Sequence, residues 1–167
     1  RPEDVMNNPQ IMAEAKLAAH KRYGDDIVVA GLDGCFVEAK AMGAESRIAA
    51  HMPIVSENRR VKSWADVDRL PTPAPSEFPR MKAVLGEAEA LLKEVGQHTA
   101  VAVIVSGPFS TAGNLMGPEN LVRAMLEEPA QLHRLLEKVT DYSLQYHRAF
   151  AGKAHALVLL EPMTATA

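Results

Sequence analysis

Three short apolar runs, the first two rich in β-branched residues, most constrain what this chain can fold into. They cover residues 26–33, 101–105 and 156–160, and turn residues bound each of them. A strand buried on both faces has such a continuous run, whereas a strand with one wet face alternates apolar and polar residues. We therefore predict three buried strands of a parallel sheet.

Helical spacing of apolar residues fills the segments between these strands. It is clearest over residues 79–95, which end at Gly96 and follow the i, i+3, i+4, i+7 pattern. Further helices are predicted over residues 9–23, over 37–42, from Pro118, and from Pro129 to Gly152. Right-handed crossovers place such helices outside the sheet. The predicted fold class is α/β, with parallel strands, helices outside and an N-terminal helical segment.

Two connecting stretches show no sustained period. We interpret residues 51–60 as a loop or an edge hairpin. Ser63 and Asp66 have the spacing of a capping box at the start of a short helix. Prolines 71, 73 and 75 then prevent the helix from continuing, so residues 71–79 are predicted to be a Pro-rich connector.

Composition narrows the class of protein. Residues 1–167, 47% of them apolar, suffice for a single domain. The net charge of −3 gives no positive field for nucleic acid, and no run approaches the ~20 apolar residues of a membrane span. Cys35 is the only cysteine, which excludes an intramolecular disulfide and a thiolate-rich metal site. A reducing compartment such as the cytoplasm is expected.

Several sequence stretches occur in an order typical of one superfamily. The two most specific are WADVDRLP at 64–71 and GPFSTA at 107–112; the others are MAEA at 12–15, YGDD at 23–26 and VEAKAMG at 37–43. This series resembles the uroporphyrinogen decarboxylase superfamily, which also contains the corrinoid-dependent methyltransferases. The resemblance implies part of a TIM (β/α)8 barrel, with an active site at the C-terminal ends of the strands.

Polar residues follow each predicted strand and are the candidate site. Asp33 and Glu161 are predicted as catalytic carboxylates, and Ser110, Asn114 and Thr164 as substrate-binding residues. By resemblance, an aspartate near the position of Asp33 accepts the pyrrole N–H groups of a tetrapyrrole in the decarboxylases. The alternatives are that Asp33 caps a turn or a helix, and that Ser110 and Asn114 satisfy backbone groups in a 107–117 loop.

Two features favour the methyltransferase branch. Asn114 stands where the decarboxylases have a tyrosine, and Glu161-Pro162 resembles the strand end of the methyltransferases. That branch, by resemblance, moves a methyl group from a methylcobamide to a thiol activated by zinc. Because its His-x-Cys motif is absent, we expect no metal ligand and no cofactor within this chain, and zinc and a corrinoid in the complete enzyme. A corrinoid protein is then a candidate partner.

Two alternatives stay open. One is a uroporphyrinogen decarboxylase, which needs no cofactor, acts on a tetrapyrrole and by resemblance forms a homodimer. The other follows from the ends of the chain, which starts on Arg1 rather than Met and stops soon after an apolar run, so that both ends are expected to be cut. Three strands cannot close a barrel, and such an inactive half-barrel would act only by association through its open edges.

Overall fold

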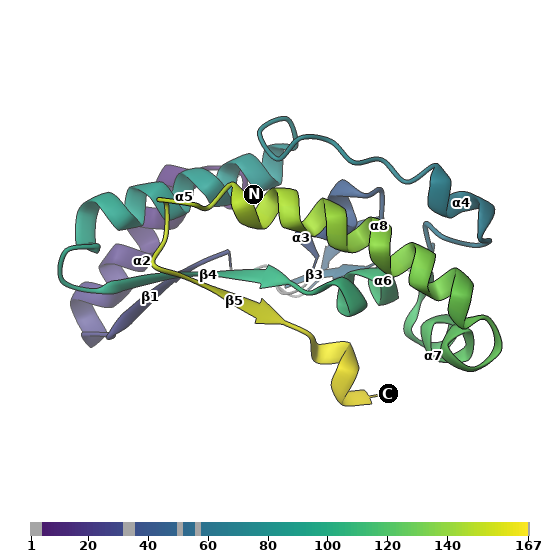
Figure 1. Cartoon of the computed structure of the whole chain (residues 1–167). Helices are drawn as coiled ribbons and strands as arrows, with labels where there is room; N and C mark the ends of the chain where they lie inside the picture. The colour runs from purple at the N-terminus through teal and green to yellow at the C-terminus, as the bar shows by residue number, and fades with distance from the viewer. Residues whose placement is uncertain (1–4, 32–35, 50–51, 56–57, 167) are drawn as a thin grey trace. The chain divides into compact units, whose positions relative to one another are not determined.

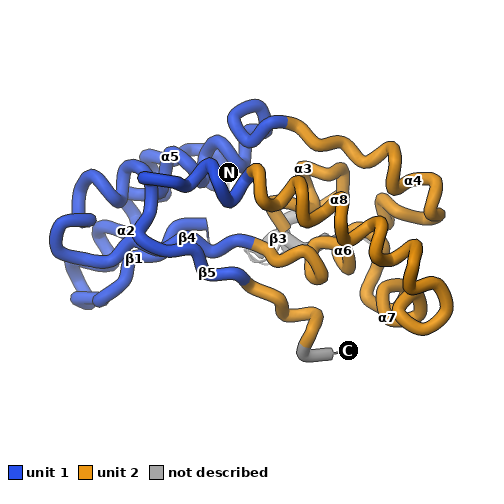
Figure 2. Tube along the Cα trace, in the orientation of Figure 1, with its two compact units in different colours: residues 1–32, 74–105, 146–159 blue, residues 33–73, 106–145, 160–167 orange. Residues whose placement is uncertain are grey.

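A computed structural model describes residues 5–31, 36–49, 52–55 and 58–166 of the chain (Figure 1). Contacts between residues divide the chain into two compact units. Unit 1 comprises residues 1–32, 74–105 and 146–159, and unit 2 comprises residues 33–73, 106–145 and 160–167 (Figure 2). The single domain expected over residues 1–167 stays a prediction.

Unit 1 is built on a three-stranded sheet. The strands β1 (Ile27–Ala30), β4 (Ala100–Ser106) and β5 (Ala156–Leu160) lie in the order β1-β4-β5. β1 and β4 are parallel, with Ile27 opposite Ala100. Both strands fall on the first two apolar runs, and this confirms the predicted parallel pairing.

Helices α2 (Pro9–Tyr23) and α5 (Pro79–Val95) pack against each other and against β1. Each starts on a proline, which fits the first helical position because that residue needs no N–H partner. The Asn8 side chain accepts hydrogen bonds from the N–H groups of Gln10 and Ile11 and so caps α2. Both helices have the bounds that the sequence predicts.

A buried ion pair holds these helices to the end of β1. The Glu87 side chain is 1% exposed, and its Oε1 lies 2.8 Å from Lys16 Nζ. Its Oε2 accepts the N–H of Gly31 at 3.3 Å, and Lys16 also donates to the carbonyl of Val29. Gly31 has a φ of 74°, a conformation that glycine adopts without steric cost. One charge pair therefore joins α2, α5 and β1.

β5 differs from the prediction of a strand buried on both faces. Its consecutive residues Leu157, Val158 and Leu159 are 41%, 42% and 52% exposed. The prediction of burial is wrong here because β5 is an edge strand with β4 as its neighbour. An exposed apolar edge strand is a surface on which another strand can pair.

Unit 2 consists of a hairpin and several helices. Strands β2 (Ser46–Ala49) and β3 (Met52–Val55) form the antiparallel hairpin, which begins before the predicted 51–60. The helical elements are α3 (Val37–Ala41), α4 (Ala65–Asp68), α6 (Pro108–Met116), α7 (Pro118–Glu127), α8 (Pro129–Arg148) and η1 (Pro162–Thr166). The last three residues of α8 belong to unit 1. No described helix combines the length and apolar character that crossing a membrane requires.

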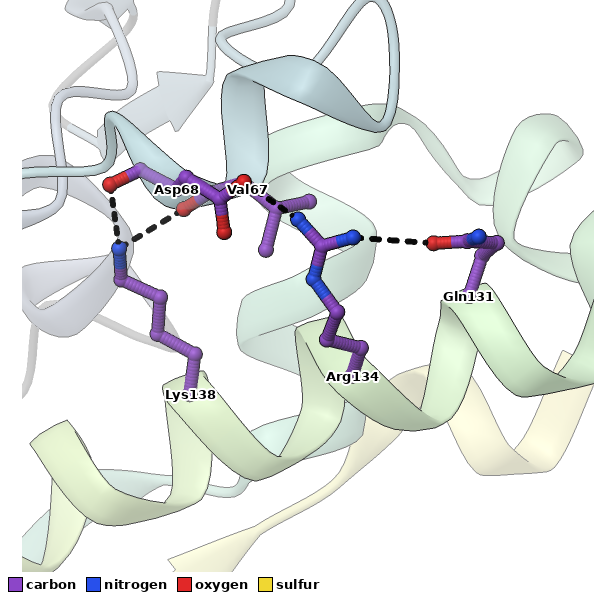
Figure 3. Close-up of polar contacts among 5 residues, drawn as sticks. All are labelled: Val67, Asp68, Gln131, Arg134 and Lys138. Atoms are coloured by element: carbon purple, nitrogen blue, oxygen red, sulfur yellow. Dashed lines mark hydrogen bonds and ion pairs between the residues drawn. The ribbon is translucent and has the colours of Figure 1, made fainter.

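Side chains hold the short helix α4 at both ends, and Figure 3 shows the contacts at its C-terminal end. At its start the Asp66 carboxylate accepts the N–H of Ser63 at 2.8 Å and the Ser63 hydroxyl at 3.0 Å. This is one half of the predicted capping box, because Ser63 Oγ donates to the carboxylate and does not accept an N–H of the helix. At its end Lys138 Nζ donates to the carbonyls of Val67 and Asp68 at 2.8 and 2.9 Å. The last carbonyls of a helix lack the donors of a further turn. The Val67 carbonyl also accepts the N–H of Leu70 at 3.3 Å, so α8 adds to the C-terminal cap of α4.

Helix α6 corrects the predicted loop over 107–117. All seven residues from Ser110 to Met116 are buried, so the sequence shows no polar face and no amphipathic period. Serine, threonine, glycine and asparagine are also weak helix formers. The segment is helical because contacts with other segments hold it, which local sequence does not reveal.

We expect Lys16→Met to lower the free energy of unfolding by about 3 kcal/mol, because it leaves the Glu87 carboxylate buried without its cation. Lys21→Met, at an exposed position of the same helix, should change it by less than about 0.5 kcal/mol. Urea unfolding followed by circular dichroism measures both. Equal effects of the two substitutions would show that the ion pair does not stabilise unit 1.

Candidate functional site

The ends of β4 and β5 meet at a group of polar residues that lies wholly in unit 2. Gly107 donates its N–H to the carbonyl of Leu160 at 2.8 Å, which ties one strand end to the other. We name the residues around this bond the strand-end cluster: Ser106, Ser110, Thr111, Asn114, Glu161, Met163 and Thr164. Four predicted site residues are thus on adjoining elements, whereas Asp33 lies outside the described residues.

The Glu161 carboxylate takes up the N-terminal donors of α6. Its Oε1 accepts the N–H of Phe109 at 3.0 Å, and its Oε2 accepts the N–H of Ser110 at 2.7 Å. A carboxylate is also the favoured group at this end of a helix because of the helix dipole. Glu161 therefore acts as the N-terminal cap of a helix that is distant in sequence.

Every donor that a helix start leaves unsatisfied has a place here. The first four N–H groups of a helix lack partners inside it. Counted from the N-cap Gly107, the first four positions of α6 are residues 107–110. Pro108 has no N–H, the N–H of Gly107 bonds the Leu160 carbonyl, and the N–H groups of Phe109 and Ser110 bond the Glu161 carboxylate. Thr111 then donates to Gly107 at 3.0 Å and starts the helical ladder. The sequence Gly-Pro-Phe-Ser thus requires an acceptor from outside, and Glu161 supplies it.

Glycines let η1 lie directly against α6. A Cβ at Gly107 would overlap the Glu161 carboxylate, and a Cβ at Gly113 would overlap the sulfur of Met163. Gly107 has an extended backbone with a φ of −80°, so space rather than conformation requires glycine there. Both glycines belong to the candidate site, although sequence reasoning did not single them out.

The hydroxyl groups of the cluster bond within it. Ser110 Oγ accepts the N–H of Met163 at 3.2 Å, and Thr111 Oγ1 donates to Ser106 Oγ at 2.9 Å. Ser106, Ser110 and Thr111 are all 0% exposed. The structure thus gives Ser110 a backbone partner, Met163, which lies outside the 107–117 segment named in the structural alternative.

Asn114 and Thr164 differ from these hydroxyl groups in their exposure or in their partners. Asn114 lies one turn along α6 from Ser110 and is 7% exposed. Thr164 is exposed and donates its Oγ1 hydrogen to the Glu161 carbonyl at 2.7 Å. The substrate-binding roles of Ser110, Asn114 and Thr164 stay predictions, as do the catalytic roles of Asp33 and Glu161.

Glu38 is a buried carboxylate that sequence reasoning missed. It lies on α3, is 1% exposed, and its Oε1 accepts the N–H of Ser106 at 2.8 Å. Burial first, and then the charge of Glu38, raise the pKa of the Tyr142 hydroxyl far above its usual value. Tyr142 therefore stays protonated at neutral pH. Glu38 belongs to the stretch VEAKAMG at 37–43, and an acidic residue within such a short apolar helix is the sequence feature that could have indicated it.

The described residues do not offer a metal site. No group of three or more histidine, cysteine, aspartate or glutamate side chains among them could hold a metal ion. Cys35 lies outside the described residues, and the absence of metal ligands from the chain stays a prediction. In the described part, the cluster fixes backbone groups at two strand ends.

The chain is similar in sequence to known proteins. The sequence model of uroporphyrinogen decarboxylase (URO-D) matches residues 2–167. The chain is 27% identical over 114 residues to a methylated-thiol–coenzyme M methyltransferase of Methanosarcina mazei, covering 59% of the chain and 31% of that protein. It is 31% identical over 147 residues to a uroporphyrinogen decarboxylase of Saccharopolyspora erythraea, covering 84% of the chain and 39% of that protein.

A solved structure resembles the chain as well. A methyltransferase from Methanosarcina mazei superposes with a TM-score of 0.78 at 23% identity, over 92% of this chain and 45% of that one. The likeness shows the fold, and it confirms the predicted α/β class built as part of a TIM barrel. The chain spans less than half the length of each of these relatives.

We expect Gly107→Ala to cost about 2 kcal/mol of unfolding free energy, because its Cβ displaces the Glu161 carboxylate. Glu161→Ala should cost a similar amount, since it leaves two N–H groups of α6 unsatisfied. Once the carboxylate is gone, the added methyl group has room. The double variant should therefore be more stable, by about 1 kcal/mol or more, than the sum of the two single-variant costs predicts.

Gly152→Ala provides the control for this cycle. A Cβ at Gly152 meets nothing within 4 Å, and the cost of the substitution comes from the φ of 72° there, which does not involve Glu161. The unfolding free-energy changes of Gly152→Ala and Glu161→Ala should add within about 0.5 kcal/mol in their double variant. Urea unfolding of the three single variants, the two double variants and the parent gives both coupling energies. Additivity at Gly107 as well would contradict the proposed contact.

Proposed function

Because the chain belongs to the uroporphyrinogen decarboxylase family, we propose that it is part of an enzyme that transfers a methyl group from a methylcobamide to a thiol. Its family relatives are enzymes of two kinds, methyltransferases and decarboxylases. For the protein that contains this chain, we favour the methyltransferase over the decarboxylase. Its substrates would be small molecules, with a corrinoid protein as a candidate partner.

The observation that carries this choice is Asn114 in the strand-end cluster. The resemblance expects a tyrosine there in a decarboxylase, and the chain has a buried amide on α6 instead. The neighbouring Glu161-Pro162 resembles the strand end of the methyltransferases. A curated methyltransferase among the relatives supports the same branch.

The role of this chain in the reaction is to bind and to position. Glu161 fixes the start of α6, and so fixes Asn114 and Ser110 relative to the end of β5. We assign substrate contact to Asn114 and to the exposed Thr164, and a catalytic carboxylate to Asp33. In the methyltransferases zinc activates the thiol. The described residues do not fit a zinc ion, so no step is assigned to zinc on them.

A uroporphyrinogen decarboxylase is the second candidate. The 31% identity over 147 residues to the Saccharopolyspora erythraea decarboxylase favours it. This enzyme would need no cofactor, and Asp33 would accept the pyrrole N–H groups of its tetrapyrrole. The proposals therefore differ in substrate and in their need for a corrinoid.

A third candidate is an inactive half-barrel that acts through association. The exposed run Leu157–Leu159 of β5 favours it, because an apolar edge strand pairs readily with another chain. Sedimentation equilibrium on the 167-residue chain tests this candidate. A monomer that turns over substrate would exclude it.

The main test compares two reactions of the same protein. Methyl transfer is followed by the absorbance of methylcobalamin in the presence of coenzyme M, and decarboxylation by chromatography of the porphyrins formed from uroporphyrinogen. Both are measured on the 167-residue chain and on the native protein that contains it. We expect the native protein to demethylate methylcobalamin and to leave uroporphyrinogen unchanged.

Asn114→Ala should lower kcat/KM for methyl transfer about tenfold, as expected for one lost hydrogen bond to substrate. Asn58→Ala, at an exposed position where Asn58 bonds Glu45, is the matched control and should leave kcat/KM unchanged. Consumption of uroporphyrinogen without methyl transfer would instead establish the decarboxylase. Unchanged kcat/KM in Asn114→Ala would remove Asn114 from the site.

A further inference from the structure

A pocket of about 180 Å³ opens in unit 2 beside helix α7. Residues 61–64 form one wall, and the end of α6 with one face of α7 forms the rest. The lining residues used below include Val61, Lys62, Trp64, Met116, Arg123 and Glu127. They are all different from the strand-end cluster, so this inference does not rest on the proposed function.

The floor of the pocket is apolar and firmly held. Val61, Met116 and Ala124 are 3%, 6% and 5% exposed, and Val61 donates its N–H to the Leu115 carbonyl at 3.0 Å. Trp64 is half-buried. These buried side chains fix the backbone of the pocket, and the half-buried Trp64 provides most of the apolar surface that a ligand can contact.

The indole of Trp64 is oriented by a short hydrogen bond. Its Nε1 donates to Glu128 Oε2 at 2.6 Å. The bond fixes the plane of the ring and engages the Glu128 carboxylate as an acceptor. Trp64 therefore forms a wall of the pocket, and Glu128 already has a partner.

Two cations lie at the rim without side-chain partners. Within the part of the chain that the structure describes, neither Lys62 Nζ nor the Arg123 guanidinium has a hydrogen bond or ion pair, and both residues are exposed. The other cations nearby are engaged: Arg59 pairs with Glu119 at 2.8 Å, and Arg60 donates to the Arg69 carbonyl at 3.0 Å. The rim thus has two cations and one uncommitted carboxylate, that of Glu127.

We propose that this pocket binds a small organic carboxylate, with its anionic group at Lys62 and Arg123 and its apolar body against Trp64. The volume lies below the roughly 300 Å³ of ordinary ligand pockets, so the ligand is the size of a simple aromatic or short-chain acid. Charge-assisted hydrogen bonds from arginine suit a carboxylate. A phosphate dianion is less suited, because Glu127 and Glu128 repel a second negative charge more strongly.

Trp64 provides the readout, since it is the only tryptophan of the chain. Benzoate is titrated into the 167-residue chain while indole fluorescence is followed, with benzyl alcohol and benzylamine as uncharged and cationic probes of the same shape. We expect a saturable change with benzoate alone. Ligand-detected NMR of the same probes gives a second readout that does not depend on fluorescence.

The variants assign the binding to the rim. Arg123→Gln and Lys62→Gln should each weaken benzoate binding about tenfold, as for loss of one charge-assisted hydrogen bond. Glu127→Gln should strengthen it. Lys93→Gln, the same change at an exposed position of α5 in the other unit, should leave it unchanged. Unchanged circular dichroism checks that each variant is folded.

Three outcomes would overturn the proposal. One is the absence of saturable benzoate binding by either readout. Another is binding of benzyl alcohol or benzylamine as tight as that of benzoate, because the cations would then not select the ligand. The third is equal affinity in the Arg123→Gln and Lys93→Gln variants.

Discussion

The hydrogen bonds from α6 to the Glu161 carboxylate set the geometry of the candidate site. Gly107 has no side chain and Pro108 has no N–H, so α6 cannot cap itself, and Glu161 accepts the N–H groups of Phe109 and Ser110. Gly107 leaves the space that the carboxylate occupies. The end of β5 therefore determines where α6 begins, and α6 in turn determines where Asn114 lies.

Local sequence predicted the elements whose pattern is local. The bounds of α2, α5 and β5 agree with the apolar periods and with the proline and glycine residues at their ends. Helix α6 was missed because all residues from Ser110 to Met116 are buried and their stabilising partner is some fifty positions away. The burial of β5 was wrong for a related reason, since an apolar run does not say how many neighbours a strand has.

The positions of the predicted strand ends indicated which residues lie together in the candidate site, but they did not indicate what each side chain binds. Ser110, Asn114, Glu161 and Thr164 lie on adjoining elements, as strand ends of a parallel sheet should. What the pattern could not give is the partner of each side chain: Glu161 bonds backbone N–H groups, and Ser110 bonds Met163. Glu38 was overlooked because its partner, Ser106, is on another element. The family relatives include methyltransferases and decarboxylases, and the proposed choice between them depends on residues such as Asn114.

Amide hydrogen exchange at Phe109 and Ser110 tests the central claim, that Glu161 caps α6, most directly. First-turn amides of a helix have no acceptor inside it and ordinarily exchange quickly. The account predicts that both amides are protected in the parent chain and that at least one of them loses its protection in Glu161→Gln, which offers one acceptor oxygen in place of two, while amides of α5 keep theirs. Fast exchange of Phe109 and Ser110 in the parent chain, or unchanged protection in Glu161→Gln, would contradict it.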